Sequence, residues 1–123
     1  MGGDGVLGEA TVEERLRRDL PRWAREGDAI VRRYRTSGWR ASVMVVGAVA
    51  HLAEAAWHHP DLTVGWSEVL VRLTSHDAGG VTERDLALAA RIEEVVTWRP
   101  GREGGPLAGT PDDPRFAYVL DEG

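Results

Sequence analysis

Histidines at three positions are the residues of this sequence best suited to chemistry. His58 and His59 are adjacent and precede Pro60, and His76 follows a segment in which apolar and polar residues alternate. Imidazole exchanges a proton readily near neutral pH, and each positioned acid or base contributes ~10²–10⁴-fold to a rate. Two imidazoles on opposite sides of a substrate can deprotonate a nitrogen and protonate a leaving hydroxyl. The histidines are therefore a candidate site for elimination of water.

Carboxylates near these histidines could fix the orientation of the rings. Glu54 lies one helical turn before His58 on the same face, where it could set the imidazole tautomer. Asp77 follows His76 and could do the same, or could simply form a turn. Because the residue before a proline is pushed into extended geometry, we expect His58 on the last helical turn and His59 turned away from the helix axis.

Each of these positions also has a purely structural interpretation. A single histidine at a helix end is more often a cap or a surface residue than a catalyst. His51, Glu54 and His58 have a spacing that would allow a metal on one helix face, but a solvated face explains them better, so we expect no metal. Capping of a helix fully explains Asp85. Three tryptophans are more often packing residues than ligand contacts: Trp57, Trp66 and Trp98.

Composition and charge exclude several classes of protein. The net charge is −5 and no cluster of Lys and Arg is present, which argues against a nucleic-acid surface. The absence of cysteine excludes disulfides and thiolate metal sites and favours a reducing compartment. The longest apolar run, Ala41–Ala50, is too short to cross a bilayer, and the N-terminus lacks the pattern of a signal peptide. We expect a cytoplasmic protein that binds neither nucleic acid nor a membrane.

Helical signals occur in three segments. We expect helices over residues 11–20, 39–57 and 82–98. Thr11 and Glu14 have the spacing of a capping box at the start of the first helix, and Thr82 with Asp85 has the same role at the start of the third. The second segment has no proline and is rich in Ala, Val and Leu, which predicts a long and mostly buried helix.

Strand signals alternate with these helices. Strands are expected over residues 28–36 and 66–76, with shorter ones near Trp23 and over Leu62–Gly65. Within 66–76, alternation assigns one set of residues to the core: Ser67, Val69, Val71, Leu73 and Ser75. Strands separated by helices and short turns predict an α+β fold, an antiparallel sheet with helices on one face.

The chain divides into three parts on this basis. Residues 1–10 form a flexible N-terminus and residues 11–98 a single domain, while residues 99–123 form a tail rich in Gly and Pro. Within the tail, Arg115–Leu120 has the composition of a strand and could dock on the domain.

Taken together, the site residues follow a recognisable spacing. Glu54, three residues, His58-His59-Pro60, five residues, Trp66, nine residues, His76, eight residues and Asp85 resemble the signature of the pterin-4a-carbinolamine dehydratase family. The segment from His76 to Asp85 is similar to the family's THDxGGLTxxD stretch, and Trp23 is placed like a tryptophan that follows the first helix. The resemblance extends over residues 12–96.

The resemblance implies a four-stranded antiparallel sheet with three helices on one face, and a homodimer or homotetramer. It implies dehydration of 4a-hydroxytetrahydrobiopterin to quinonoid dihydrobiopterin, with no cofactor and no metal. His59 and His76 would be the principal acid/base pair, assisted by His58. Supporting residues would be Glu54, Asp77 and Asp85; residues contacting the pterin would be Trp57, Pro60, Ser75 and Trp23.

Some features depart from the family pattern. Ser75 stands where threonine is usual, Trp66 where tyrosine is commoner, and a bulky Trp57 precedes the histidine pair. The tail has no counterpart in a minimal member. Two alternatives follow: a same-fold enzyme recruited to another dehydration or cyclisation in secondary metabolism, or a non-catalytic assembly or dimerisation factor. Relatives of the assembly type lose the histidine pair, whereas this sequence keeps it, which favours catalysis.

Overall fold

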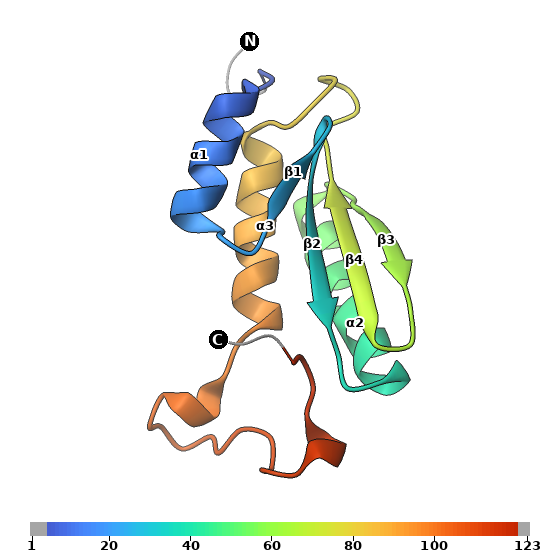
Figure 1. Ribbon diagram of the computed structural model, residues 1–123, viewed down its shortest axis with the longest axis vertical. Coiled ribbons are helices and arrows are strands. Elements are labelled where there is room, and N and C mark those ends of the chain that lie inside the picture. The colour runs from blue at the N-terminus through green and yellow to red at the C-terminus, as the bar shows by residue number, and fades with distance from the viewer. Residues whose placement is uncertain (1–4, 121–123) are drawn as a thin grey trace.

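A four-stranded antiparallel sheet and three helices make up the folded domain (Figure 1). The computed structural model of the chain describes residues 5–120. The strands are β1 (Ala24–Glu26), β2 (Ala29–Arg35), β3 (Asp61–Val64) and β4 (Glu68–Leu73), in the order β1-β2-β4-β3. The helices are α1 (Glu9–Asp19), α2 (Trp39–Ala56) and α3 (Glu83–Val96). This confirms the predicted α+β class.

The core lies between the sheet and the helices. In β4, Val69, Val71 and Leu73 are fully buried, which confirms the face assigned from alternation. Ser75 continues that face and is also buried, whereas Ser67 lies in the turn before β4 and is exposed. The strand is shorter than expected at both ends because turns precede and follow it. The opposite face of the sheet carries charged residues such as Arg33 and Arg72.

The second helix buries one stripe of small and β-branched residues, among them Val45 and Val49, and ends in a left-handed residue. Trp57 has φ 53° and ψ 48°, and its N–H donates to the Glu54 carbonyl. The His58 N–H donates to the Ala53 carbonyl (3.1 Å). This pair of bonds is a Schellman motif. The expectation that His58 sits on the last helical turn is therefore wrong, because the left-handed Trp57 ends the helix three residues before Pro60.

The first helix begins earlier than its sequence signals indicated. It starts at Glu9 after Gly8, with no side-chain cap, so the capping box proposed at Thr11 is wrong. A backbone bond from Leu7 N–H to the Val81 carbonyl (2.8 Å) ties the entry of α1 to the entry of α3, and the helix follows directly. Glu9 and Ala10 are helical rather than part of a flexible N-terminus, of which residues 1–4 lie outside the described part.

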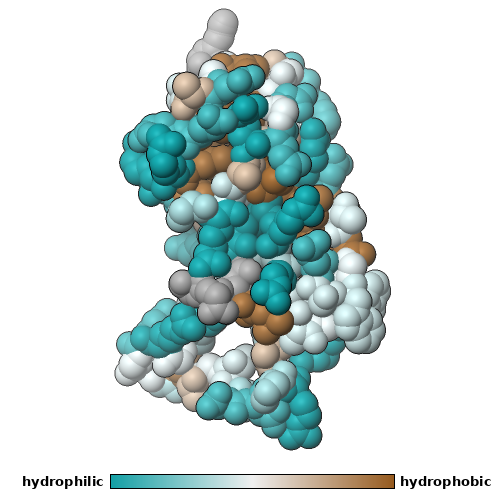
Figure 2. Space-filling view, viewed as in Figure 1, coloured by the Kyte–Doolittle hydropathy of each residue, from teal (hydrophilic) through white to brown (hydrophobic). Residues whose placement is uncertain are grey.

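After α3 the chain forms a long exposed loop that returns to the sheet (Figure 1). It contains two short 3₁₀ turns, Pro100–Arg102 and Pro114–Phe116. The space-filling view shows an opening between this loop and the body of the molecule (Figure 2). The expected strand in the tail is only one antiparallel bridge, between Thr36 and Val119, although Val119 is buried. Residues 121–123 of the tail lie outside the described part.

None of the helices within residues 5–120 is both long enough and apolar enough to cross a membrane.

Candidate active site

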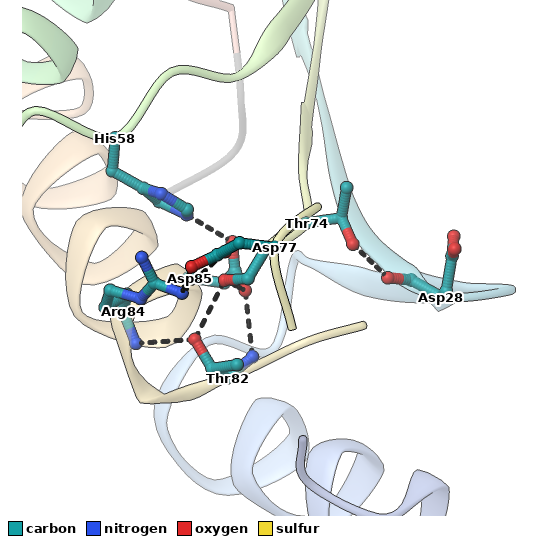
Figure 3. Close-up of polar contacts among 8 residues, drawn as sticks. Asp28, His58, Thr74, Asp77, Thr82, Arg84 and Asp85 are labelled. Carbon is teal, nitrogen blue, oxygen red and sulfur yellow. Dashed lines mark hydrogen bonds and ion pairs between the residues drawn. The ribbon is translucent and has the colours of Figure 1, made fainter. Parts of the chain in front are cut away.

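His58 faces the buried carboxylate of Asp85 (Figure 3). The His58 Nε2 and Asp85 Oδ1 atoms are 2.6 Å apart, with 12% of the His58 side chain and none of the Asp85 side chain exposed. His58 follows the end of α2, while Asp85 lies in the first turn of α3. An ionised carboxylate only accepts hydrogen bonds, so His58 Nε2 donates this one, and in a neutral His58 ring Nδ1 is then the nitrogen that can accept a proton.

The second oxygen of Asp85 is held by two donors on the other side (Figure 3). Asp85 Oδ2 accepts from the Ser75 hydroxyl (2.7 Å) and from the Thr82 N–H (2.8 Å). Since the Ser75 proton is used on Asp85, the Thr82 hydroxyl donates to Ser75 Oγ (2.9 Å). Three donors thus satisfy a fully buried carboxylate, which would otherwise be costly to bury.

Asp85 therefore has two functions. It completes the predicted capping box of α3 with Thr82, and with its other oxygen it fixes the His58 ring. Capping explained Asp85 completely at the level of sequence, and the contact with His58 was not expected. The expectation that Glu54 partners His58 is wrong.

Glu54 instead contacts His59. The Glu54 Oε1 and His59 Nε2 atoms are 3.0 Å apart, and both side chains are exposed. The Trp57 ring meets the His59 ring edge to face, with 4.9 Å between the ring centroids. The two adjacent histidines thus differ in environment: His58 is rigidly held by a buried group, whereas His59 lies in solvent beside an aromatic ring.

His76 is exposed on the turn that follows β4. Backbone bonds close this turn: the Ser75 N–H donates to the Gly80 carbonyl (3.0 Å), and the Gly79 N–H donates to the Ser75 carbonyl (2.9 Å). Because Ser75 also binds Asp85, the buried contacts link the backbone next to His76 with His58.

Asp77 takes part in this turn through a different partner. Its carboxylate accepts from Arg84 Nη2 (2.9 Å), and this hydrogen bond lowers the pKa of Asp77 below its ordinary value (Figure 3). Asp77 thus ties the turn to the start of α3 rather than contacting His76. The part played by Arg84 was not foreseen from the sequence.

Trp23 lies in a separate polar cluster. It is buried, and its indole N–H donates to Glu93 Oε1 (2.9 Å). Arg32 Nε and the Tyr34 hydroxyl donate to the same oxygen (2.9 and 2.7 Å). Burial raises the pKa of Glu93, but these hydrogen bonds outweigh burial and hold the pKa below its ordinary value. None of these hydrogen bonds to Glu93 connects Trp23 with a histidine.

Across residues 5–120, no group of three or more His, Asp or Glu side chains could hold a metal ion. Two shallow hollows are formed around α1, one lined by residues that include Arg15 and Glu83 and the other by residues that include Trp23. Neither contains a histidine.

An α+β domain with a histidine pair after its long helix, one of them held by an aspartate at the entry of the last helix, defines a recognisable class. The family model described as pterin 4 alpha carbinolamine dehydratase matches residues 6–95, and the chain belongs to this family.

Individual relatives agree with this assignment. A protein of Aquifex aeolicus (strain VF5) that carries the family's name is 47% identical over 87 residues, which cover 68% of this chain and 88% of the relative. One from Thermomicrobium roseum is 45% identical over 91 residues, covering 74% and 97%. A solved structure described as a transcriptional coactivator/pterin dehydratase from Brucella melitensis has a TM-score of 0.69 and 28% identity, covering 75% of this chain and 99% of that one. A pterin dehydratase-like RuBisCO assembly factor of the α-carboxysome, at 23% identity and a TM-score of 0.53, shares the fold.

Proposed function

We propose that this chain converts 4a-hydroxytetrahydrobiopterin to quinonoid dihydrobiopterin and water, in recycling of the pterin cofactor. In this reaction a ring nitrogen loses a proton, the hydroxyl on the neighbouring carbon gains one and leaves as water, and a carbon–nitrogen double bond forms. Family membership and the His58–Asp85 contact support the proposal, because the contact fixes an imidazole with one nitrogen free at the family's signature position.

His59 and His76 are proposed as the principal acid/base pair. Both side chains are exposed, so a substrate can reach them without rearrangement of the core. His58 is proposed to contact the substrate and to assist proton transfer from its fixed position. Asp85 and Glu54 support the histidines that they contact, and Asp77 supports the turn that carries His76.

Four residues are proposed as substrate contacts: Trp57, Pro60, Ser75 and Trp23. Trp57 is the most open to a ligand, with 74% of its surface exposed, whereas Ser75 and Trp23 are buried. We propose a cytoplasmic homodimer or homotetramer that needs no cofactor and has no nucleic-acid or membrane partner. A sequence without cysteine supports a reducing compartment.

The test is a dehydration assay on 4a-hydroxytetrahydropterin with the parent chain, His59→Ala and His76→Ala. We expect the parent to accelerate the reaction above its spontaneous rate. Each alanine variant should lose roughly 10²–10⁴-fold of that acceleration, because a positioned acid or base is removed.

His51→Ala is the matched control, since His51 is an exposed histidine on α2 outside the proposed machinery, and it should retain the parent rate. A parent chain with no acceleration would refute the pterin substrate and favour a recruited enzyme or a non-catalytic factor. Full activity of both alanine variants would refute the assignment of the pair.

A further inference from the structure

The edge of β2 is only partly covered by its neighbour β1. Register places β1 against Ala29–Val31, whereas β2 continues to Arg35. On the other side, β4 pairs along nearly the whole of β2, and the Thr36 N–H donates to the Ser67 carbonyl (2.9 Å). The N–H and C=O groups of successive residues in a strand point to opposite sides. Because the Thr36 N–H points toward the β4 side, the N–H and C=O groups of the odd-numbered residues after Val31 point away from β4. That stretch of edge would otherwise offer free backbone groups to any extended chain.

The end of the tail pairs with the far end of this edge, at Arg35 and the two residues that follow β2. The Leu120 N–H donates to the Arg35 carbonyl (2.8 Å), and the Ser37 N–H donates to the Tyr118 carbonyl (3.1 Å). These two bonds flank the antiparallel bridge between Thr36 and Val119. The tail therefore adds to the sheet in the manner of a short edge strand.

Three side-chain contacts make this edge a site with its own specificity. The Val119 side chain is 6% exposed and belongs to the hydrophobic core cluster. The Val119 carbonyl accepts from Arg99 Nη2 (2.8 Å), and the Ala117 carbonyl accepts from the Ser37 hydroxyl. Backbone pairing gives such sites affinity, and a pocket for one side chain gives them selectivity.

The connection between the domain and this docked segment is long and open. Residues 101–112 are all exposed, and an opening separates the loop from the body of the molecule (Figure 2). A linker of this length reaches tens of ångströms when extended, at about 3.3 Å per residue. The groups that hold the segment are Arg35, Ser37, Arg99 and the core residues around Val119, and all of them belong to the host. The same segment of a second molecule would therefore meet the same groups.

We propose that the backbone edge at Arg35–Ser37, at the end of β2, is together with Arg99 a strand-addition site that takes the segment Ala117–Leu120 from a second copy of this chain. Within one chain the site is closed by its own tail, and between chains the tails exchange. Exchange of an identical element uses contacts that already exist and creates none that is new, which makes it a low-cost route to association. The family model ends at residue 95, so the docked segment and Arg99 lie beyond the matched domain, whereas the edge of β2 belongs to it. It does not depend on the proposed reaction.

The first experiment asks whether the site accepts the segment from outside. The host is the chain truncated after Phe116, and the probe is a fluorescein-labelled peptide of residues 113–123, followed by fluorescence anisotropy. We expect saturable binding to the truncated host and weak binding to the full chain, whose own tail competes. A Val119→Asp peptide should bind roughly 10- to 100-fold more weakly, because the buried valine is lost and a charge is brought in.

Far-UV circular dichroism of the truncated host checks that the domain is folded. Should truncation unfold it, the full chain with Val119→Asp serves as host, since its tail is complete but released. Failure of the folded host to bind the parent peptide, or equal binding of both peptides, would overturn the site.

The second experiment asks whether tails exchange between full-length chains. Sedimentation velocity over a range of concentrations should reveal an association step in the parent that Val119→Asp lacks. Phe116→Asp, at an exposed neighbouring position, is the control and should keep the step. Peptide binding without any such step in the parent would overturn the exchange between copies.

Discussion

At the scale of single residues, the carboxylate of Asp85 both caps α3 and holds His58. Its two oxygens point to different elements, one to His58 after α2 and the other to Ser75 and Thr82. A side chain used only as a cap would leave His58 free to choose between tautomers. The buried position makes the contact rigid, because water cannot replace any of its three donors.

We predict that Asp85→Asn releases the His58 ring. The free energy of unfolding should fall by about 1–3 kcal/mol, since a buried hydrogen-bonded charge is replaced by a weaker and partly mismatched amide. The more specific readout is nitrogen NMR of His58, which should lose its preference for a proton on Nε2.

Glu54→Gln is the matched control, because it changes the carboxylate that contacts the neighbouring histidine. That pair is exposed, so we expect a change of at most about 1 kcal/mol in unfolding free energy and no change in the His58 tautomer. An unaltered His58 spectrum in Asp85→Asn would contradict the positioning role.

At the scale of elements, the end of α2 determines where both histidines of the pair lie. Among residues 5–120, Trp57 is the one non-glycine residue with a positive φ. The left-handed conformation costs a bulky residue roughly 1–2 kcal/mol, whereas Asn tolerates it. Strain next to candidate catalytic groups is consistent with a functional position, and here it turns His58 toward Asp85 and leaves His59 in solvent.

We predict that Trp57→Asn stabilises the fold by about 0.5–1 kcal/mol, because it relieves this strain and loses only an exposed ring contact. Urea denaturation measures the change. Trp66→Asn serves as comparison, since Trp66 is similarly exposed but has an ordinary φ, and should give no gain. A loss of stability in Trp57→Asn would mean that the contact with His59 outweighs the strain.

At the scale of the whole molecule, two features hold the layers together. The Glu93 cluster joins α3 to β2 and to the chain before β1, through Arg32, Tyr34 and Trp23. The tail pairs with the chain at the end of β2 through Val119. Neither feature includes the candidate histidines, so the frame can be altered without changing the proposed acid/base groups, although Trp23, a proposed substrate contact, belongs to the Glu93 cluster.

The Glu93 cluster predicts how stability depends on pH. Because the folded-state pKa of Glu93 lies below its ordinary value of 4.5, the carboxylate is favoured in the folded state. Its contribution is fully present above about pH 4.5 and is lost as pH falls through the lowered pKa. We expect Glu93→Gln to lose about 2–4 kcal/mol at pH 7, because the buried Arg32 loses the carboxylate that pairs with its charge. The variant should also show a smaller fall in unfolding free energy between pH 5 and 3.

Glu94→Gln, on the same helix and in an exposed ion pair with Arg91, is the control and should follow the parent at every pH. Equal pH dependence of Glu93→Gln and the parent in urea denaturation would show that other groups carry the acid sensitivity.

The sequence by itself determined the element types, the buried face of β4, the capping box of α3 and the set of residues in the signature. These are local properties: alternation, caps and breakers act over a few residues. The sequence misplaced the start of α1 and the end of α2. The start of α1 follows the backbone bond from Leu7 to Val81 rather than a cap at Thr11, and the end of α2 is determined by the left-handed Trp57 rather than by Pro60.

Only the tertiary structure decided which carboxylate meets which histidine. His58 and Asp85 are 27 residues apart and meet because α2 and α3 pack side by side, which leaves Glu54 to His59. The same holds for Trp23 and Glu93, which are 70 residues apart, and for the tail on β2. Such contacts depend on the relative placement of whole elements, and no short-range pattern encodes that placement.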